Sequence, residues 1–132
     1  MKRILIVDDE QAILDSLELL LEDRYQLALA KDGAEALSAL EREPFDLVLL
    51  DVLMPILDGV TVLREMRARA LDVPVILLSA HANLETTARD LGPVDVLAKP
   101  FDIWELELKI DRALEEAERR RRRGTGEAAA VT

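Results

Sequence analysis

The sequence predicts an α/β protein with an open, doubly wound parallel sheet, and three observations lead to this prediction. Strongly apolar runs without alternation at 4–7, 47–50 and 73–78, and a weaker one at 94–98, are typical of strands buried on both faces of a parallel sheet. Segments with helical periodicity separate these runs, and right-handed crossovers then place helices on both faces of the sheet. Half of the 132 residues are apolar, which suffices for the core of one domain.

The other elements follow from their apolar patterns. A fifth strand at 25–30 is predicted mainly from its place between two helical segments. Apolar stripes at helical spacing predict a helix within 13–21 and a last helix within 103–117, with Trp104 packing on the face of that helix. A third helix passes through Val62, Leu63 and Met66, and a weaker one is predicted from Asn83 to position 91.

Two helix starts carry a capping signal. The sequences DGAE at 32–35 and DIWE at 102–105 have the Asp-x-x-Glu spacing of a capping box. We therefore expect one helix to begin after Asp32 and another after Asp102.

Composition and net charge argue against membrane proteins and nucleic-acid-binding proteins. The chain has no cysteine, no signal-peptide pattern and no apolar run near the roughly 20 residues of a membrane span, so we expect a soluble cytoplasmic protein without a membrane partner. The net charge of −10 argues against direct binding of nucleic acid.

The C-terminal segment differs from the rest. We expect a folded domain over 1–118 and, over 119–132, an arginine-rich helix end followed by a disordered tail. Arginines at 119–123 interact favourably with the dipole of a helix that Gly124 can end. The alternative is an anchor for an acidic partner or a junction to a further domain.

Polar residues follow four of the predicted strands. Asp8 and Asp9 come after the first, Asp51 after the third, Ser79 after the fourth and Lys99 after the fifth. Ligands of open α/β sheets bind at the carboxyl ends of the strands, so these side chains are expected at one site.

Three carboxylates at one site need a cation. Each pair of like charges about 4 Å apart costs roughly 4 kcal/mol at an effective dielectric constant near 20. One lysine cannot balance three carboxylates, whereas Mg²⁺ prefers oxygen ligands and keeps positions for water or phosphate oxygens. The sequence therefore predicts a site for Mg²⁺ and a phosphate-like group.

The sequence also restricts the phosphate chemistry. It contains neither a G-x-x-x-x-G-K-[ST] loop nor a G-x-G-x-x-G motif after the first strand, which argues against a P-loop nucleotide site and a dinucleotide site. An aspartate can itself form an aspartyl phosphate, with a magnesium ion, a lysine and a hydroxyl stabilising the phosphoryl oxygens.

Four segments together resemble the receiver domains of two-component response regulators. They are ILIVDDE, LVLLDVLMPILDG, PVILLSA and LAKPF, in this order, within residues 2–118. The resemblance implies a flavodoxin-like sheet with the strand order 2-1-3-4-5.

The resemblance also implies a role for each site residue. Asp51 is the phosphoacceptor, and the metal ligands are Asp8, Asp9, Asp51 and the backbone carbonyl of Leu53. Ser79, the amide of Ala80 and Lys99 contact the phosphoryl group. The Lys99-Pro100 bond is expected to be cis, and Asp58-Gly59 is expected to shape the loop after the acceptor.

Two positions stand apart from the shared motifs. Val96 occupies the position, three residues before the lysine, at which many receivers carry a Tyr or Phe that responds to phosphorylation. His81 is expected to be a solvent-facing loop residue, and in this family its position can influence the lifetime of the phosphoryl group.

The resemblance implies a phosphoacceptor switch rather than a turnover enzyme, one that catalyses its own phosphotransfer and dephosphorylation. A sensor histidine kinase or a histidine phosphotransfer protein phosphorylates it, and the switch then binds an unknown protein target or forms a dimer. The alternatives are the N-terminal receiver of a longer transcriptional regulator, an aspartate-nucleophile phosphatase, or a receiver that only binds partners.

Overall fold

A computed structural model describes residues 1–80 and 91–131 of the chain, and it contains one five-stranded parallel sheet in the predicted order β2-β1-β3-β4-β5. The strands are β1 (Arg3–Val7), β2 (Gln26–Ala30), β3 (Leu47–Asp51), β4 (Val75–Ser79) and β5 (Val94–Ala98). The helices in the described part are α1 (Gln11–Leu21), α2 (Gly33–Arg42), α3 (Gly59–Ala68) and α5 (Ile103–Val131). His81 and the helix predicted from Asn83 lie outside the described residues.

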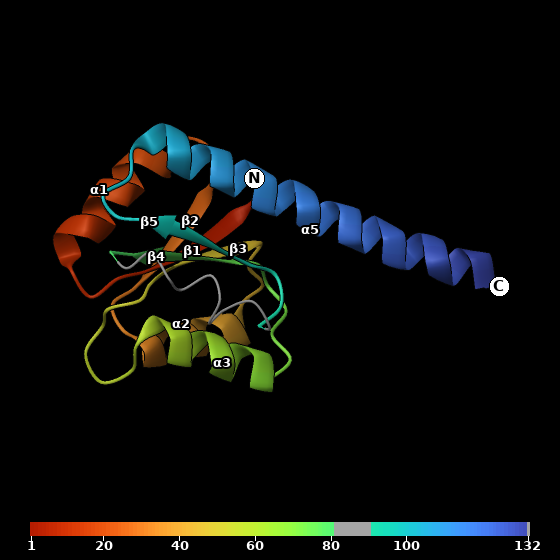
Figure 1. Cartoon of the computed structure of the whole chain (residues 1–132), viewed down its shortest axis with the longest axis horizontal. Helices are drawn as coiled ribbons and strands as arrows, with labels where there is room; N and C mark the ends of the chain where they lie inside the picture. Colours follow the sequence, from red (N-terminus) through yellow and green to blue (C-terminus); the bar gives the residue numbers. More distant parts are fainter. Residues whose placement is uncertain (81–90, 132) are drawn as a thin grey trace.

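The sheet separates two layers of helices. Helices α1 and α5 lie on one face and α2 and α3 on the other (Figure 1). Successive residues of a strand point to opposite faces, so Ile6 packs in the α1/α5 core and Val7 in the α2/α3 core. All residues of β3 and β4 are buried, which explains why both strands are apolar up to their last residues, Asp51 and Ser79.

Aspartates cap three of the helices. Oδ1 of Asp32 accepts a hydrogen bond from the Glu35 N–H at 2.8 Å, and Oδ1 of Asp102 accepts one from the Glu105 N–H at 2.8 Å. Both predicted helix starts are therefore confirmed. Asp58 caps α3 in the same way.

Strand β4 is shorter than predicted because of Pro74. The prediction began the strand at Val73, but regular pairing begins at Val75. Proline has no N–H to donate to a neighbouring strand. The Pro74 carbonyl still accepts a hydrogen bond from the Val48 N–H at 3.0 Å.

The prediction for Trp104 was wrong, since this residue is 78% exposed. Leu106 and Ile110 are the residues that face the sheet. At 100° per residue, Trp104 lies about 200° around the helix from Leu106, on the opposite side.

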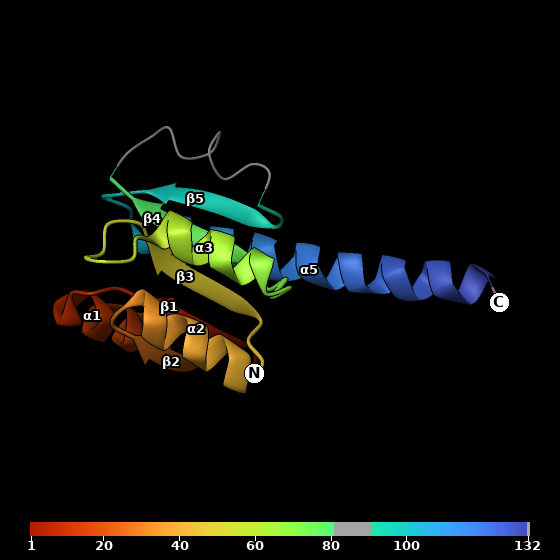
Figure 2. The same ribbon diagram turned by 90° about the horizontal axis from the view of Figure 1, so that it is seen from below.

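Helix α5 also continues beyond its predicted end. It extends to Val131 and projects away from the sheet (Figures 1 and 2), whereas the sequence predicts an end at Gly124 and then a tail. Glycine within a helix costs only about 1 kcal/mol relative to alanine, and the good helix formers at 127–130 follow it. No helix in the described part of the chain has the length and apolar character required to cross a membrane.

Candidate functional site

The parallel register brings the predicted polar residues to one edge of the sheet. Val7 pairs with Leu50 and Ser79 pairs with Ala98, so β1, β3, β4 and β5 end close to the same level. The Lys99 N–H donates a hydrogen bond to the Ser79 carbonyl at 2.7 Å, which fixes the backbone of Lys99 beside the end of β4. Side chains from four separate segments thus reach the carboxyl edge of the sheet.

Lys99 and Asp51 form a direct contact at this edge. The Lys99 Nζ donates a hydrogen bond to Asp51 Oδ1 at 2.9 Å, and the same nitrogen lies 3.9 Å from Asp8 Oδ2. Asp51 is only 5% exposed. The Lys99 ammonium therefore forms a salt bridge with a carboxylate that is almost fully buried.

Asp8 is buried with one oxygen unsatisfied. Its Oδ1 accepts a hydrogen bond from the Glu10 N–H at 2.9 Å, whereas its buried Oδ2 has no hydrogen-bond partner among the described residues. Burial raises the pKa of the Asp8 carboxyl above its ordinary value of 3.8, and the negative charge of Asp51 adds to the rise. The Glu10 hydrogen bond and Lys99 oppose that shift. Such a group is costly for the fold unless a ligand satisfies it.

Three carboxylates lie close enough to hold one cation. Oxygen atoms of Asp8, Asp9 and Asp51 all lie within 4.8 Å of one another. Two of these residues are buried and Asp9 is exposed, which leaves the cluster open to solvent on one side. A hard divalent cation such as Mg²⁺ fits this all-oxygen donor set and the unsatisfied Oδ2 of Asp8.

The loop after β3 passes very close to Asp51 at Gly59. A Cβ atom at this position would lie 2.4 Å from the Asp51 carbonyl oxygen and 2.9 Å from the Val52 Cα, so only glycine fits without a shift of the backbone. The Gly59 N–H also donates a hydrogen bond to the Val52 carbonyl at 2.9 Å. The sequence predicts that Asp58-Gly59 shapes this loop but not that Gly59 touches the backbone of Asp51.

The remaining predicted site residues occupy the same edge. Ser79 ends β4 and is 1% exposed, and Ala80 follows it on the surface. Leu53 lies in the loop two residues after Asp51, with its side chain 61% exposed. The Lys99-Pro100 bond is cis, as predicted. The roles of Ser79, Ala80 and Leu53 towards a phosphoryl group or a metal stay predictions.

Val96, at the position where many receivers carry a Tyr or Phe, is buried in the α2/α3 core.

Sequence reasoning missed Arg67 of α3, whose guanidinium donates hydrogen bonds to four backbone carbonyls at the amino edge of the sheet. A usable signal existed, because Arg67 follows Leu63 by four residues and so falls near the buried face of the helix.

A five-stranded parallel sheet in the order 2-1-3-4-5, with an acidic cluster and a lysine at its carboxyl edge, places the protein in the flavodoxin-like class of α/β proteins. Within that class, residues 4–111 match the family described as response regulator receiver domain. The chain belongs to this family and is a receiver domain of two-component signalling.

Individual relatives agree with this assignment. The chain is 43% identical over 127 residues to the transcriptional regulatory protein PrrA of Mycobacterium tuberculosis, covering 93% of this chain and 52% of PrrA. It is 38% identical to the response regulator MprA of Mycolicibacterium vanbaalenii, covering 98% of this chain and 57% of MprA. The chain thus spans about half the length of these curated relatives.

Solved structures show the same fold. A CheY-like receiver domain protein from Methanospirillum hungatei is 33% identical, with a TM-score of 0.83 and coverage of 91% of this chain and 98% of that one. The response regulator TrrA of Thermotoga maritima, solved in complex with Mg(2+)-BeF, is 35% identical. Its TM-score is 0.77, and the match covers 86% of this chain and all of that chain.

Proposed function

We propose that Asp51 accepts a phosphoryl group from a histidine kinase or a histidine phosphotransfer protein, and that the phosphorylated domain binds its protein target differently. The observation that carries this proposal is the buried Asp51 carboxylate, held 2.9 Å from the Lys99 ammonium beside the unsatisfied Asp8 oxygen. Receiver domains act in signalling, and a cytoplasmic location is typical of them.

The transfer step uses residues already at the site. An Asp51 carboxylate oxygen bonds to phosphorus while the bond from phosphorus to the donor's imidazole nitrogen breaks and the imidazole leaves. Negative charge on the phosphoryl oxygens would then lie near Lys99, which stabilises it electrostatically. The Ser79 hydroxyl and the Ala80 amide would donate hydrogen bonds to the same oxygens.

Asp8, Asp9 and Asp51 would hold the metal, together with the Leu53 carbonyl. Receiver domains generally bind Mg²⁺, and TrrA is a relative whose structure contains it. Bound to these carboxylates, Mg²⁺ would supply the positive charge that phosphoryl transfer requires. The unsatisfied Asp8 Oδ2 supports this assignment from within the chain itself.

A second candidate is the receiver part of a longer transcriptional regulator. It is supported by the transcriptional regulator PrrA, of which the chain matches about half. In that case the phosphorylation chemistry is the same, and the target of the switch is another domain of the same protein.

Intact mass spectrometry after incubation with acetyl phosphate tests the proposal. We expect one phosphoryl group on the wild type in the presence of Mg²⁺, and none after EDTA treatment or in Asp51→Asn. Asp72→Asn is the matched control, because Asp72 is an exposed aspartate at the opposite edge of the sheet and should leave labelling unchanged.

Two results would contradict the proposal. Labelling of Asp51→Asn to the same extent as the wild type would exclude Asp51 as the acceptor. Absence of labelling with both acetyl phosphate and phosphoramidate, which contains the P–N bond of a phosphohistidine, would show that the site is not a phosphoacceptor.

A further inference from the structure

Helix α5 carries two exposed apolar side chains on the side that points away from the sheet. Trp104 is 78% exposed and Leu108 is 52% exposed, and they lie about one turn apart on the helix. This side of α5 belongs to the outer surface of the α1/α5 layer (Figure 1). Tryptophan often carries a large share of the binding energy of protein interfaces, so a tryptophan next to a leucine indicates a contact surface.

Charged residues continue this surface towards the C-terminus. Four of them are exposed and lie within about 40° of Leu108 around the helix axis, at 100° per residue. We define the outer face of α5 by six residues: Trp104, Leu108, Arg112, Glu115, Arg119 and Arg122. The face therefore has an apolar end and a charged end.

The sign of the charge changes along the helix. Residues 103–118 contain six acidic and two basic residues, whereas the next five residues are all arginine. A helix of this kind is complementary to a second copy of itself in the antiparallel orientation, because the basic end of each helix then lies beside the acidic part of the other.

Most charged groups of the outer face have no partner within the described part of the chain. Arg122 lies 3.8 Å from Glu118, at the limit of a salt bridge. Among the described residues, five side chains on the face or at its edge form no salt bridge or hydrogen bond: Glu105, Arg112, Glu115, Arg119 and Arg123. A partner can therefore pair with these charges without breaking a contact of the folded chain.

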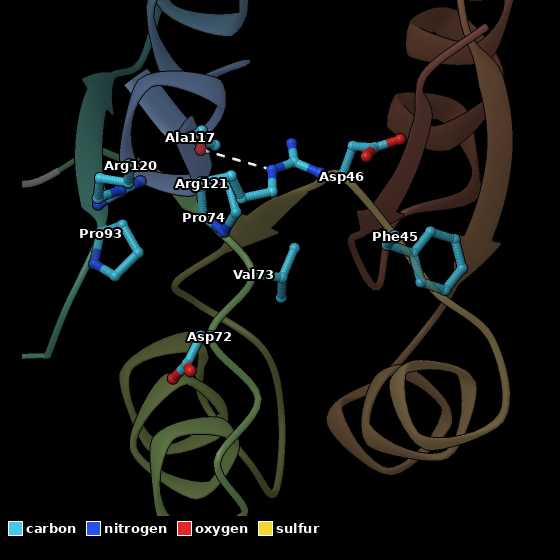
Figure 3. A pocket seen from close by; sticks show the side chains of 9 residues that line it. All are labelled: Phe45, Asp46, Asp72, Val73, Pro74, Pro93, Ala117, Arg120 and Arg121. Carbon is cyan, nitrogen blue, oxygen red and sulfur yellow. Dashed lines mark hydrogen bonds between the residues drawn. The ribbon is translucent and has the colours of Figure 1, made fainter. Parts of the chain in front are cut away.

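The other two arginines of the run lie on a different side of α5. Arg120 and Arg121 line a hollow at the amino edge of the sheet, together with Pro74 and Pro93 (Figure 3). The Arg121 Nε also donates a hydrogen bond to the Ala117 carbonyl at 3.5 Å. These two residues do not belong to the outer face, so they offer a matched control for it.

We propose that the outer face of α5 binds the same face of a second copy of this chain, with the two helices antiparallel. Such a pair has a twofold axis, so every contact occurs twice. With the axis between residues 113 and 114, Trp104 comes next to Arg122 of the second copy, and a guanidinium can stack on the indole ring. Leu108 comes next to Arg119, whose aliphatic stem can cover it.

The same axis brings opposite charges together. Arg112 comes next to Glu115 of the second copy, and Glu105 comes next to Arg123. Asp111 approaches Glu115 of the second copy with like charge, but Arg24 lies 3.7 Å from Asp111 in its own chain and offsets that repulsion. Paired from position 104 to position 123, the two helices would touch along about 30 Å.

A second copy fits the outer face better than a nucleic acid does. Glu115 lies between Arg112 and Arg119 on this face, whereas binding to a phosphate backbone needs continuous positive charge. The proposal goes beyond phosphate transfer and does not depend on it. It can therefore be tested in the Asp51→Asn protein without a phosphodonor.

Analytical ultracentrifugation and tryptophan fluorescence over a dilution series test the proposal. Trp104 is the single tryptophan of the chain, so its emission reports on the outer face alone. We expect a dimer that dissociates on dilution, with Trp104 emission at shorter wavelength in the dimer because the ring leaves water. Added salt should weaken the dimer, because it screens the ion pairs.

Charge reversal locates the interface. We expect Arg122→Glu/Arg123→Glu to raise the dimer dissociation constant at least about tenfold. Arg120→Glu/Arg121→Glu makes the same change of charge on the neighbouring residues outside the face, and it should stay within about twofold of the parent. Trp104→Ala should weaken the dimer as strongly as the reversal on the face.

A mixture of two single variants tests the antiparallel pairing. Glu105→Arg and Arg123→Glu should each weaken self-association, and an equimolar mixture should recover the parent affinity because the reversed charges match again. Recovery would also show that both variants are folded.

Four results would overturn the proposal. They are a monomeric mass at all concentrations up to about 1 mM, equal losses in the two double variants, no recovery in the mixture, and a dimer with unchanged Trp104 emission. Binding of an RNA oligonucleotide by a protein that stays monomeric would assign the arginines to nucleic acid instead.

Discussion

The two edges of the sheet differ in how fully a buried charged group is hydrogen-bonded. At the carboxyl edge, Asp8 is 1% exposed, and within the part of the chain that the structure describes one of its oxygens has no hydrogen-bond partner. The carboxylates of Asp9 and Asp51 lie close to it and carry the same charge. At the amino edge, the partly buried guanidinium of Arg67 donates hydrogen bonds to four carbonyls. Burial of a charge is costly unless hydrogen bonds satisfy it. Arg67 therefore stabilises the fold, whereas Asp8 destabilises it unless a ligand satisfies its carboxylate.

Loss of Arg67 should cause the largest change in stability. Arg67→Met removes the donors of four carbonyls at the starts of β4 and β5, and we expect the free energy of unfolding to fall by about 2–4 kcal/mol. Urea denaturation measures this change. Arg64→Met is the control, because Arg64 is an exposed arginine on the same helix, and it should change stability by less than about 0.5 kcal/mol. Equal effects of the two variants would refute the role of Arg67.

Gly59→Ala should damage both the fold and the site. The new Cβ would meet the Asp51 backbone at 2.4 Å, and we expect a loss of about 1–3 kcal/mol together with slower labelling by acetyl phosphate. At Gly33 the nearest atoms, 2.6 Å away, belong to the side chains of Leu57 and Val62 and not to the backbone of Asp51. Gly33→Ala should therefore leave the labelling rate near that of the wild type. Unchanged labelling in Gly59→Ala would show that the close approach does not position Asp51.

Asp8→Asn should stabilise the protein in the absence of Mg²⁺. The variant removes a buried charge from a carboxylate cluster, and we expect a gain of about 1–2 kcal/mol at neutral pH, measured by urea denaturation with EDTA. A loss of stability would mean that the Asp8 charge is satisfied in the folded protein.

The gain in the free energy of unfolding of Asp8→Asn should also depend on pH. The folded-state pKa of Asp8 is raised, so its carboxyl group favours the folded state fully below the unfolded value of 3.8 and loses this contribution as the pH rises through the folded pKa. The difference between variant and wild type should thus be small below pH 3.8, grow above it and then level off. A difference that shrinks as the pH rises would contradict the direction of the pKa shift.

Addition of Mg²⁺ should cause the smallest change in the free energy of unfolding. At ten times its dissociation constant, a ligand that binds only the folded state adds about 1.4 kcal/mol, and thermal melts with increasing MgCl₂ measure this gain. The effect should disappear in Asp8→Asn and Asp9→Asn. CaCl₂ tests whether the small, rigid coordination of Mg²⁺ is preferred. Equal Mg²⁺ stabilisation in the Asp9→Asn variant would remove Asp9 from the ligand set.

The sequence by itself determined the architecture and the membership of the acidic site. Strands that are buried on both faces of a parallel sheet are apolar along most of their length, so β1, β3 and β4 were recognisable from short runs of residues. The partly buried β5, which contains Asp95, gave a weaker signal. Because parallel strands end at the same edge, the residues that follow them had to meet there. Asp8, Asp9, Asp51, Ser79 and Lys99 were therefore predictable as one site before any distance was known.

Only the tertiary structure decided which polar groups at the two edges of the sheet have hydrogen-bond partners. Three features depend on how loops and strand ends are placed in the folded chain: the Asp8 Oδ2 that lacks a hydrogen bond among the described residues, the approach of Gly59 to the Asp51 carbonyl, and the four carbonyls that accept from Arg67. Trp104 shows the same limit, since its exposure depends on which side of α5 meets the sheet. Apolar periodicity reports which residues are buried, but hydrogen-bond satisfaction requires positions to within a few tenths of an ångström.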